Sequence, residues 1–170
     1  MQYIKIPEER VGILLGENGS IKREIERKTR TKIKVDNCEV SIEGQPMDEW
    51  IAKDIVKAIA RGFSPEKALK LLDENYSFEI IRLKDFANTE KELIRKKARV
   101  IGEHGRAREK IEESTDTYIS IYGKTISIIG RYEDAEIAKE AIIKLLNGAS
   151  HRSVYKFLEK KLRFKREVII

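Results

Sequence analysis

The chain contains an internal repeat. Residues 16–59 and 102–145 align without a gap and share 15 identities in 44 positions. The most distinctive shared segment is a glycine loop, Gly16-Glu17-Asn18-Gly19 in the first copy and Gly102-Glu103-His104-Gly105 in the second. A repeat of this length that occurs only twice predicts two copies of one folded unit, not a solenoid.

Each copy predicts the same order of elements. Alternating polar and apolar residues favour strands, and apolar residues every three to four positions favour helices. The order is strand, helix, glycine loop, helix, two strands joined by a turn, and helix. In the first copy these segments are strand 2–6, helices 8–15 and 20–29, strands 31–35 and 39–43, and a helix with Asp48 as its N-cap. In the second copy they are strand 78–83, helices 90–101 and 106–113, strands 118–122 and 125–129, and helix 134–146.

A further helix is expected after each copy. The segment 64–72 overlays 150–158, and Pro65 suits the first turn of a helix. The boundary between the copies is expected near residue 75, which predicts two domains, 1–75 and 76–170. Thr89, followed by Glu92 three residues later, has the pattern of a capping box before the helix at 90–101.

The positive charge is concentrated at the end of the chain. The net charge is +6 over 170 residues, but residues 1–85 carry 16 basic and 16 acidic residues. Residues 151–170 carry seven basic and two acidic residues. Such a basic segment favours contact with a polyanion or, alternatively, forms a solvated helix that packs on the second domain. A charged, salt-bridged surface of the kind found in heat-adapted proteins is a further interpretation of the composition.

The sequence offers little chemistry for catalysis. Neither glycine loop has the Gly-Lys-Ser/Thr of a P-loop, and no dinucleotide-binding glycine motif occurs. The single cysteine, Cys38, cannot form an internal disulfide, and neither His104 nor His151 has a partner at metal-binding spacing. We therefore expect no enzymatic activity, metal or cofactor. No long apolar run or signal peptide is present, which leads us to expect a cytoplasmic protein without membrane contact.

A glycine loop that ends one helix and begins another has a direct use. It presents main-chain N–H groups at the positive end of a helix, where they can bind a phosphate group. Glycine lets the phosphate approach the main chain and permits positive φ angles. Two such loops at equivalent positions predict that the chain binds nucleic acid.

The segments 11–19 and 98–105 resemble the core of the KH domain, and the helix after the last strand of each copy resembles the type I arrangement. The resemblance covers nearly the whole chain. It implies an α+β fold of two tandem type I KH domains (βααββα), each with a three-stranded sheet packed on three helices. KH domains clamp about four nucleotides of single-stranded nucleic acid between the glycine loop and an apolar groove.

The same resemblance implies a set of RNA-binding residues. Glu17 and Glu103 stand where KH domains often carry a basic residue, so their side chains are expected to point away from the phosphates, or the affinity is modest. The expected contacts in the first domain are Gly16, Glu17, Asn18, Gly19, Lys22, Arg23, Ile25, Lys32 and Ile33. Those in the second are Arg99, Gly102, Glu103, His104, Gly105, Arg106, Arg108, Ile111 and Ile119. Core packing is the alternative role for the isoleucines.

The linker 60–69, the following segment 76–80 and the tail segment 146–155 resemble the Dim/Krr ("partner of Nob") group of KH proteins, in an archaeal form that keeps both glycine loops. This resemblance implies a ribosome-assembly factor that binds the 3′ region of small-subunit (16S) ribosomal RNA. The implied partners are a PIN-domain endonuclease or another ribosome-assembly or translation factor. A general KH protein of RNA decay or transcription, and a protein-interaction scaffold that has lost RNA binding, remain alternatives.

Overall fold

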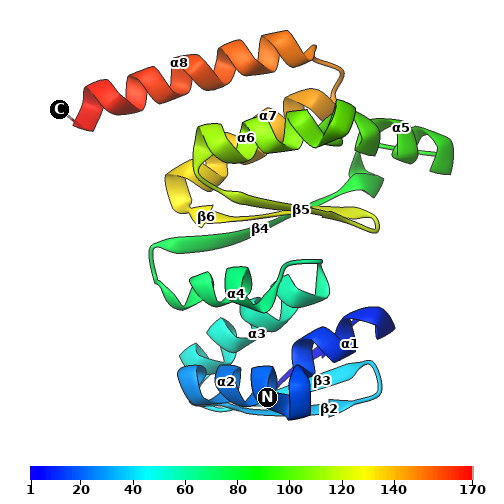
Figure 1. Cartoon of the computed structure of the whole chain (residues 1–170), viewed down its shortest axis with the longest axis vertical. Coiled ribbons are helices and arrows are strands. Elements are labelled where there is room, and N and C mark those ends of the chain that lie inside the picture. The colour runs from blue at the N-terminus through cyan, green and yellow to red at the C-terminus, as the bar shows by residue number, and fades with distance from the viewer. Residues whose placement is uncertain (170) are drawn as a thin grey trace. The chain divides into compact units, whose positions relative to one another are not determined.

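The computed structural model describes residues 1–169. The chain divides into two compact units, Met1–Phe78 and Glu79–Ile170. Each copy of the repeat forms one three-stranded antiparallel sheet with its helices over one face (Figure 1). This arrangement confirms the expected α+β class and the order of elements in both copies.

The first copy forms a sheet of order β1-β3-β2. Ile4, Val40, Ile42 and Ile33 alternate with polar residues along these strands and are buried beneath the helices, as the period-two pattern requires. The elements are β1 (Gln2–Lys5), α1 (Glu8–Leu15), the 3₁₀ turn η1 (Glu17–Gly19), α2 (Ser20–Thr29), β2 (Lys32–Asp36), β3 (Glu39–Glu43), α3 (Pro46–Ala60), α4 (Pro65–Ala68) and η2 (Leu69–Leu72).

The second copy repeats this topology with a sheet of order β4-β6-β5. Its core combines Val100, Ile111, Ile126, Ile128 and Ile142, all fully buried. The elements are β4 (Tyr76–Arg82), η3 (Leu83–Asp85), α5 (Glu90–Ile101), η4 (Glu103–Gly105), α6 (Arg106–Thr115), β5 (Tyr118–Tyr122), β6 (Thr125–Arg131), α7 (Tyr132–Leu146) and α8 (His151–Ile169).

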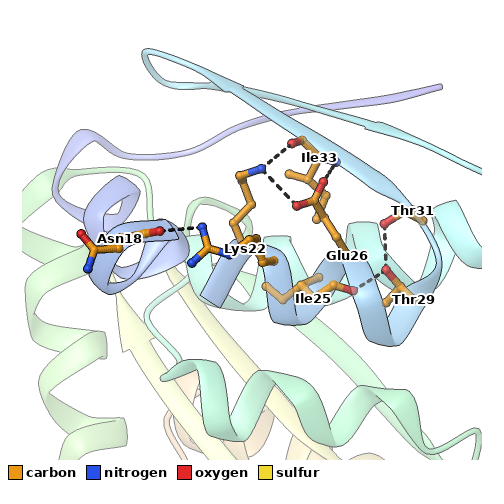
Figure 2. A network of polar contacts seen from close by, with 8 residues as sticks. Asn18, Lys22, Ile25, Glu26, Thr29, Thr31 and Ile33 are labelled. Atoms are coloured by element: carbon orange, nitrogen blue, oxygen red, sulfur yellow. Dashed lines mark hydrogen bonds and ion pairs between the residues drawn. The ribbon is translucent and has the colours of Figure 1, made fainter. Parts of the chain in front are cut away.

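Residues that are identical in the two copies hold α2 and its equivalent α6 against their sheets. The Thr29 hydroxyl donates to the Ile25 carbonyl at 2.6 Å and contacts the Thr31 hydroxyl at 2.7 Å, as Figure 2 shows. The equivalent atoms of Thr115, Ile111 and Thr117 lie at 2.6 and 2.8 Å. These threonines are therefore repeated because they satisfy buried polar groups at the turn into the next strand.

Two expected helix starts were wrong. Asp48 is not an N-cap: α3 begins at Pro46, which occupies the first helical position after Gln45. Asp48 lies within the first turn and forms an ion pair with Arg30 at 3.3 Å. Likewise α7 begins at Tyr132, two residues before the expected start at Asp134. Asp48 was taken for the cap and Asp134 for the first helical residue, although both lie in the first turn, since a cap and a first turn favour the same residue types.

The start of α5 was predicted correctly. The Thr89 hydroxyl accepts a hydrogen bond from the Glu92 N–H at 3.1 Å, and the Glu92 carboxylate accepts one from the Asn88 N–H at 3.1 Å. The bond from Asn88, with further help from Lys96, lowers the pKa of Glu92. The helices that follow the two copies differ in length, since α4 is a single turn continued by η2, whereas α8 has 19 residues.

Candidate nucleic-acid interface

The two glycine loops have nearly identical backbones. Gly16 has φ and ψ of 71° and −178°, and Gly102 has 77° and 174°. The third loop residues, Asn18 and His104, both adopt left-handed conformations, with φ of 55° and 56°. The repeat therefore encodes one loop geometry twice, although the residue at this third position differs.

The first glycine of each loop is required by close packing. A Cβ on Gly102 would lie 2.7 Å from the Ala107 main-chain nitrogen, and one on Gly16 would lie 2.9 Å from the Ile21 nitrogen. The second glycine is different, since a Cβ on Gly105 would meet no atom within 4 Å and one on Gly19 would meet only the end of the flexible Arg23 side chain, at 3.1 Å. The first glycine thus lets two helices meet, whereas the second leaves the loop surface open to a ligand.

The start of the helix after each loop is open. Gly19 and Gly105 are the N-caps of α2 and α6, both in left-handed conformation, and no side chain caps either helix. The first main-chain N–H groups of a helix carry partial positive charge and lack acceptors within the helix. Each loop therefore presents the chemistry of an anion site, as expected from the sequence.

Lys22 and Arg108 each take part in a polar contact, here called the clasp, that joins the helix after the glycine loop to the edge strand of the sheet. Glu26 accepts hydrogen bonds from the Ile33 N–H at 2.9 Å and from Lys22 Nζ at 3.1 Å (Figure 2). In the second copy the Ile119 N–H donates to Glu112 at 2.9 Å, and Arg108 pairs with that carboxylate at 3.1 Å.

The clasp covers main-chain groups that face away from the sheet. Lys22 Nζ also lies 3.2 Å from the Ile33 carbonyl oxygen. Both β2 and β5 are edge strands, so these groups have no neighbouring strand as partner. The basic residues at these two positions thus hold α2 and α6 to their sheets, and their charge is largely neutralised by the adjacent glutamates.

Arg99 caps the end of a helix. Its guanidinium donates to the carbonyls of Leu145, at 3.3 Å, and Ala149. In the first copy Arg10 donates to the equivalent carbonyls of Ile59 and Phe63, at 2.8 and 2.6 Å. The two arginines occupy different turns of their helices yet bind the same pair of carbonyls. Arg99 therefore has a structural task that the sequence analysis missed, and we leave it out of the proposed contacts.

The four isoleucines of the expected grooves belong to the core. Ile25 and Ile111 are fully buried, and Ile33 and Ile119 are only 2% and 4% exposed. Core packing, the alternative raised by the sequence, accounts for their positions. Any contact with RNA in these grooves would have to use other surfaces, chiefly the loops and the basic residues that flank them.

The available charge near the two loops differs. Arg23 donates to the carbonyl of Asn18 at 2.6 Å and so binds the first loop itself. Lys32, on β2, and Arg106, at the start of α6, are exposed and form no ion pair or side-chain hydrogen bond within residues 1–169. The second loop thus has an uncommitted arginine at the first position of its helix, where the first loop has Ser20.

The acidic loop residues point into solvent. Glu103 is 84% exposed and lies 3.8 Å from His104, which is 75% exposed. Glu17 is exposed as well. Within the described residues no cluster of His, Cys, Asp and Glu could hold a metal ion, and no helix is both long and apolar enough to cross a bilayer.

Family models match both copies. The model of the eukaryotic type KH domain (KH-domain type I) matches residues 77–163, and the KH domain model matches residues 1–58. The chain is also 44% identical over 167 residues to a KH domain-containing protein of Methanocaldococcus jannaschii, covering 95% of this chain and 74% of that protein. The expected tandem KH domains are thereby confirmed.

More specific relatives include the pre-rRNA-processing protein pno1 of Aspergillus fumigatus, 38% identical over 112 residues. That match covers 64% of this chain and 44% of pno1, so the chain spans less than half the length of this relative. Among solved structures, a chain of the a/eIF2alpha–aDim2p–rRNA complex from Pyrococcus horikoshii is 46% identical, with a TM-score of 0.88. The alignment covers 95% of this chain and 93% of that chain.

Proposed function

Because this chain belongs to the archaeal Dim2/Pno1 family of KH-domain proteins, we propose that it binds single-stranded RNA through its glycine loops during assembly of the small ribosomal subunit. The observation that carries the proposal is the open start of α6 beside Gly105. There the open main-chain surface at Gly105, the uncapped N-terminus of α6 and the exposed, uncommitted Arg106 are adjacent to one another. A phosphate group of an RNA strand suits all three features.

The RNA proposed is the 3′ region of small-subunit ribosomal RNA. This choice is supported by the relatives, since one is named for pre-rRNA processing and another was crystallised with rRNA. The protein would act without catalysis, in the cytoplasm, and would bring that RNA to a PIN-domain endonuclease or to a translation or assembly factor. The proposed contacts are Gly16, Asn18, Gly19 and Lys32 in the first domain and Gly102, His104, Gly105 and Arg106 in the second.

The third loop position provides a direct test. Aspartate tolerates the left-handed conformation there, so Asn18→Asp and His104→Asp add a carboxylate without forcing the backbone. We expect the double variant to bind an oligonucleotide of the rRNA 3′ end about 100-fold more weakly, because like charges meet at the phosphate. Fluorescence anisotropy measures this loss. Asn37→Asp, at another left-handed turn residue far along the chain from either loop, is the matched control.

The outcome separates the competing functions. Affinity that is lost only for rRNA 3′-end sequences supports the assembly role, and equal loss on unrelated sequences favours a general KH protein. Unchanged affinity in the double variant contradicts binding through the loops. The scaffold alternative gains support if the wild-type chain binds no single-stranded RNA, and its acidic loop residues Glu17 and Glu103 would then be the first surface to examine.

A further inference from the structure

Helix α8 carries a stripe of four basic residues on its outer side. Arg152, Lys156, Lys160 and Arg163 follow one another at intervals of four, four and three residues, which places them on one face of a helix. All four side chains are exposed. At a rise of about 1.5 Å per residue the stripe is about 16 Å long.

The opposite side of α8 is fixed to the second domain. Val154 and Leu158 are buried, and the helix packs against α6 and α7 (Figure 1). His151 Nε2 lies 2.8 Å from the Arg99 carbonyl oxygen, and Lys165 forms an ion pair with Asp134. The stripe is thus held in one orientation by contacts at both ends of the helix.

The stripe brings like charges close together. Like charges at i and i+4 on a helix repel each other, and the stripe has two such pairs, Arg152 with Lys156 and Lys156 with Lys160. Within residues 1–169 none of its four members forms an ion pair. Glu159 and Glu167 lie on the same face of the helix as the stripe, so this face carries four basic and two acidic residues. A helix face that keeps an excess of positive charge, with none of its basic side chains in an ion pair, is typical of a surface for an external anion.

We propose that this stripe binds the sugar–phosphate backbone of double-helical RNA next to the single strand held by the second glycine loop. The inference rests on the proposed function and adds a second RNA site to it. A rigid, straight row of charges suits the regular phosphates of a duplex, which proteins recognise by shape and charge. The stripe itself contains no aromatic side chain on which unpaired bases could stack.

A membrane surface is a poorer partner for α8. Amphipathic helices that bind membranes insert an apolar face between the lipids. In α8 the apolar side, with Val154 and Leu158, is already buried against its own domain. The exposed aromatic residue beside the stripe, Phe164, is 65% exposed and offers a single contact. The first copy lacks this surface, because α4 and η2 end at Leu72.

The test compares two RNAs that share one single-stranded segment from the rRNA 3′ end. One is the segment alone, and the other carries a hairpin at its end. We expect the wild-type chain to bind the hairpin RNA about tenfold more tightly near 0.1 M salt. Replacing all four stripe residues by glutamine removes this gain, reduces the salt slope of hairpin binding by about three, and leaves binding of the single strand unchanged.

A matched control removes the same charge elsewhere. Lys5, Lys34, Lys84 and Lys124 are also exposed, and their replacement by glutamine keeps the gain if the stripe is the site. If both variants lose the gain in affinity for the hairpin RNA equally, the proposal is overturned, and the total positive charge of the chain accounts for the gain. Loss of single-strand affinity in the stripe variant, or in Phe164→Ala, overturns the choice of duplex RNA. Binding of the wild-type chain to phosphatidylserine vesicles, without any hairpin gain, overturns it in favour of a membrane.

Failure of the two proposals can be told apart. If the wild-type chain binds the hairpin but not the single strand, the function proposed for the loops fails and the duplex site stands. If it binds both RNAs equally, the loops stand and the duplex site fails.

Discussion

The two glycine loops share a backbone and differ in charge. Gly16 and Gly102 adopt the same unusual conformation, and each is followed by an uncapped helix. The first loop is bound by its own Arg23, whereas the second has Glu109 at the equivalent position and an uncommitted Arg106. Packing thus preserves the loop geometry in both copies. The charge of the side chains on and beside the loops differs between the copies, because exposed side chains do little to determine the fold.

This comparison indicates a division of labour. The second domain combines the more basic loop with the basic stripe of α8, and the first domain has neither. We expect the second domain to supply most of the RNA affinity. The first domain has exposed Met47 and Trp50 at the start of α3, 73% and 59% exposed, a surface more typical of protein contacts.

The largest expected effect concerns the geometry that the loops share. Gly102→Ala should destabilise the second domain by about 3 kcal/mol, because the new methyl group would meet the Ala107 main chain at a backbone conformation open only to glycine. Gly105→Ala should cost about 1 kcal/mol, since its site is open and only the left-handed conformation is unfavourable. Hydrogen exchange of peptides from α5 and α6 measures both losses.

The first loop provides the comparison for this pair. Gly16→Ala and Gly19→Ala should show the same order of losses in α1 and α2, because Ile21 lies as close to Gly16 as Ala107 does to Gly102. Equal losses for the first and second glycine of one loop would contradict close packing as the reason for the first.

The second prediction concerns the arginines that cap the last helix of each repeat. Arg10→Met and Arg99→Met should each destabilise their own domain by about 2 kcal/mol, because two carbonyls lose a charged donor. Faster hydrogen exchange at the C-terminal ends of α3 and α7 is the expected signal. The salt dependence of RNA binding should not change. A lower salt slope in Arg99→Met would restore Arg99 to the RNA-binding residues.

The third prediction exchanges the residues that begin the two loop helices. Arg106→Ser should weaken RNA binding by about fivefold through loss of one phosphate contact, and Ser20→Arg should strengthen binding by the first domain by a similar factor. Each change is measured by anisotropy with the other loop inactivated by aspartate at its third position. If Ser20→Arg has no effect, the weakness of the first loop lies in its contact with Arg23 and not in missing charge.

The fold was predictable because the sequence pattern of each helix and strand occurs in both copies of the repeat. Helices α1, α2 and α5 and strands β3 and β5 have the bounds expected from the sequence, since glycine loops, turns and alternation mark their ends. The starts of α3 and α7 were missed because an acidic residue suits a cap and a first turn equally. The repeat did not predict how far α8 extends, because the match between 64–72 and 150–158 ends at Leu158. Only the basic residues that follow Leu158 in the sequence distinguished this segment.

The loops of the candidate site were predictable, but their surroundings were not. The resemblance placed Lys22, Arg99 and Arg108 on the RNA because they are basic and close in sequence to the loops. The structure shows that each makes contacts within its domain, with Glu26, the end of α7 and Glu112 respectively. Glu26 and Glu112 are identities of the repeat, and this was the one signal that could have revealed the clasps.

The smallest effect distinguishes the last helices of the two copies. Asp54 on α3 is half-buried, and burial raises its pKa despite the nearby Lys57 and Lys53. A carboxyl whose pKa is raised on folding stabilises the folded state when the pH is below the pKa of the same group in the unfolded chain, near 3.8. This stabilisation is lost as the pH rises through the pKa of the group in the folded state. Asp54→Asn should therefore stabilise the first domain slightly at neutral pH and less in acid. The equivalent Glu140 is exposed, so Glu140→Gln should leave the stability of the second domain unchanged.

Urea denaturation at pH 3 and pH 7, followed by the fluorescence of Trp50 in α3, measures the effect of Asp54→Asn. A stabilisation by Asp54→Asn that is the same at both pH values would show that helix propensity, and not the buried charge, is responsible.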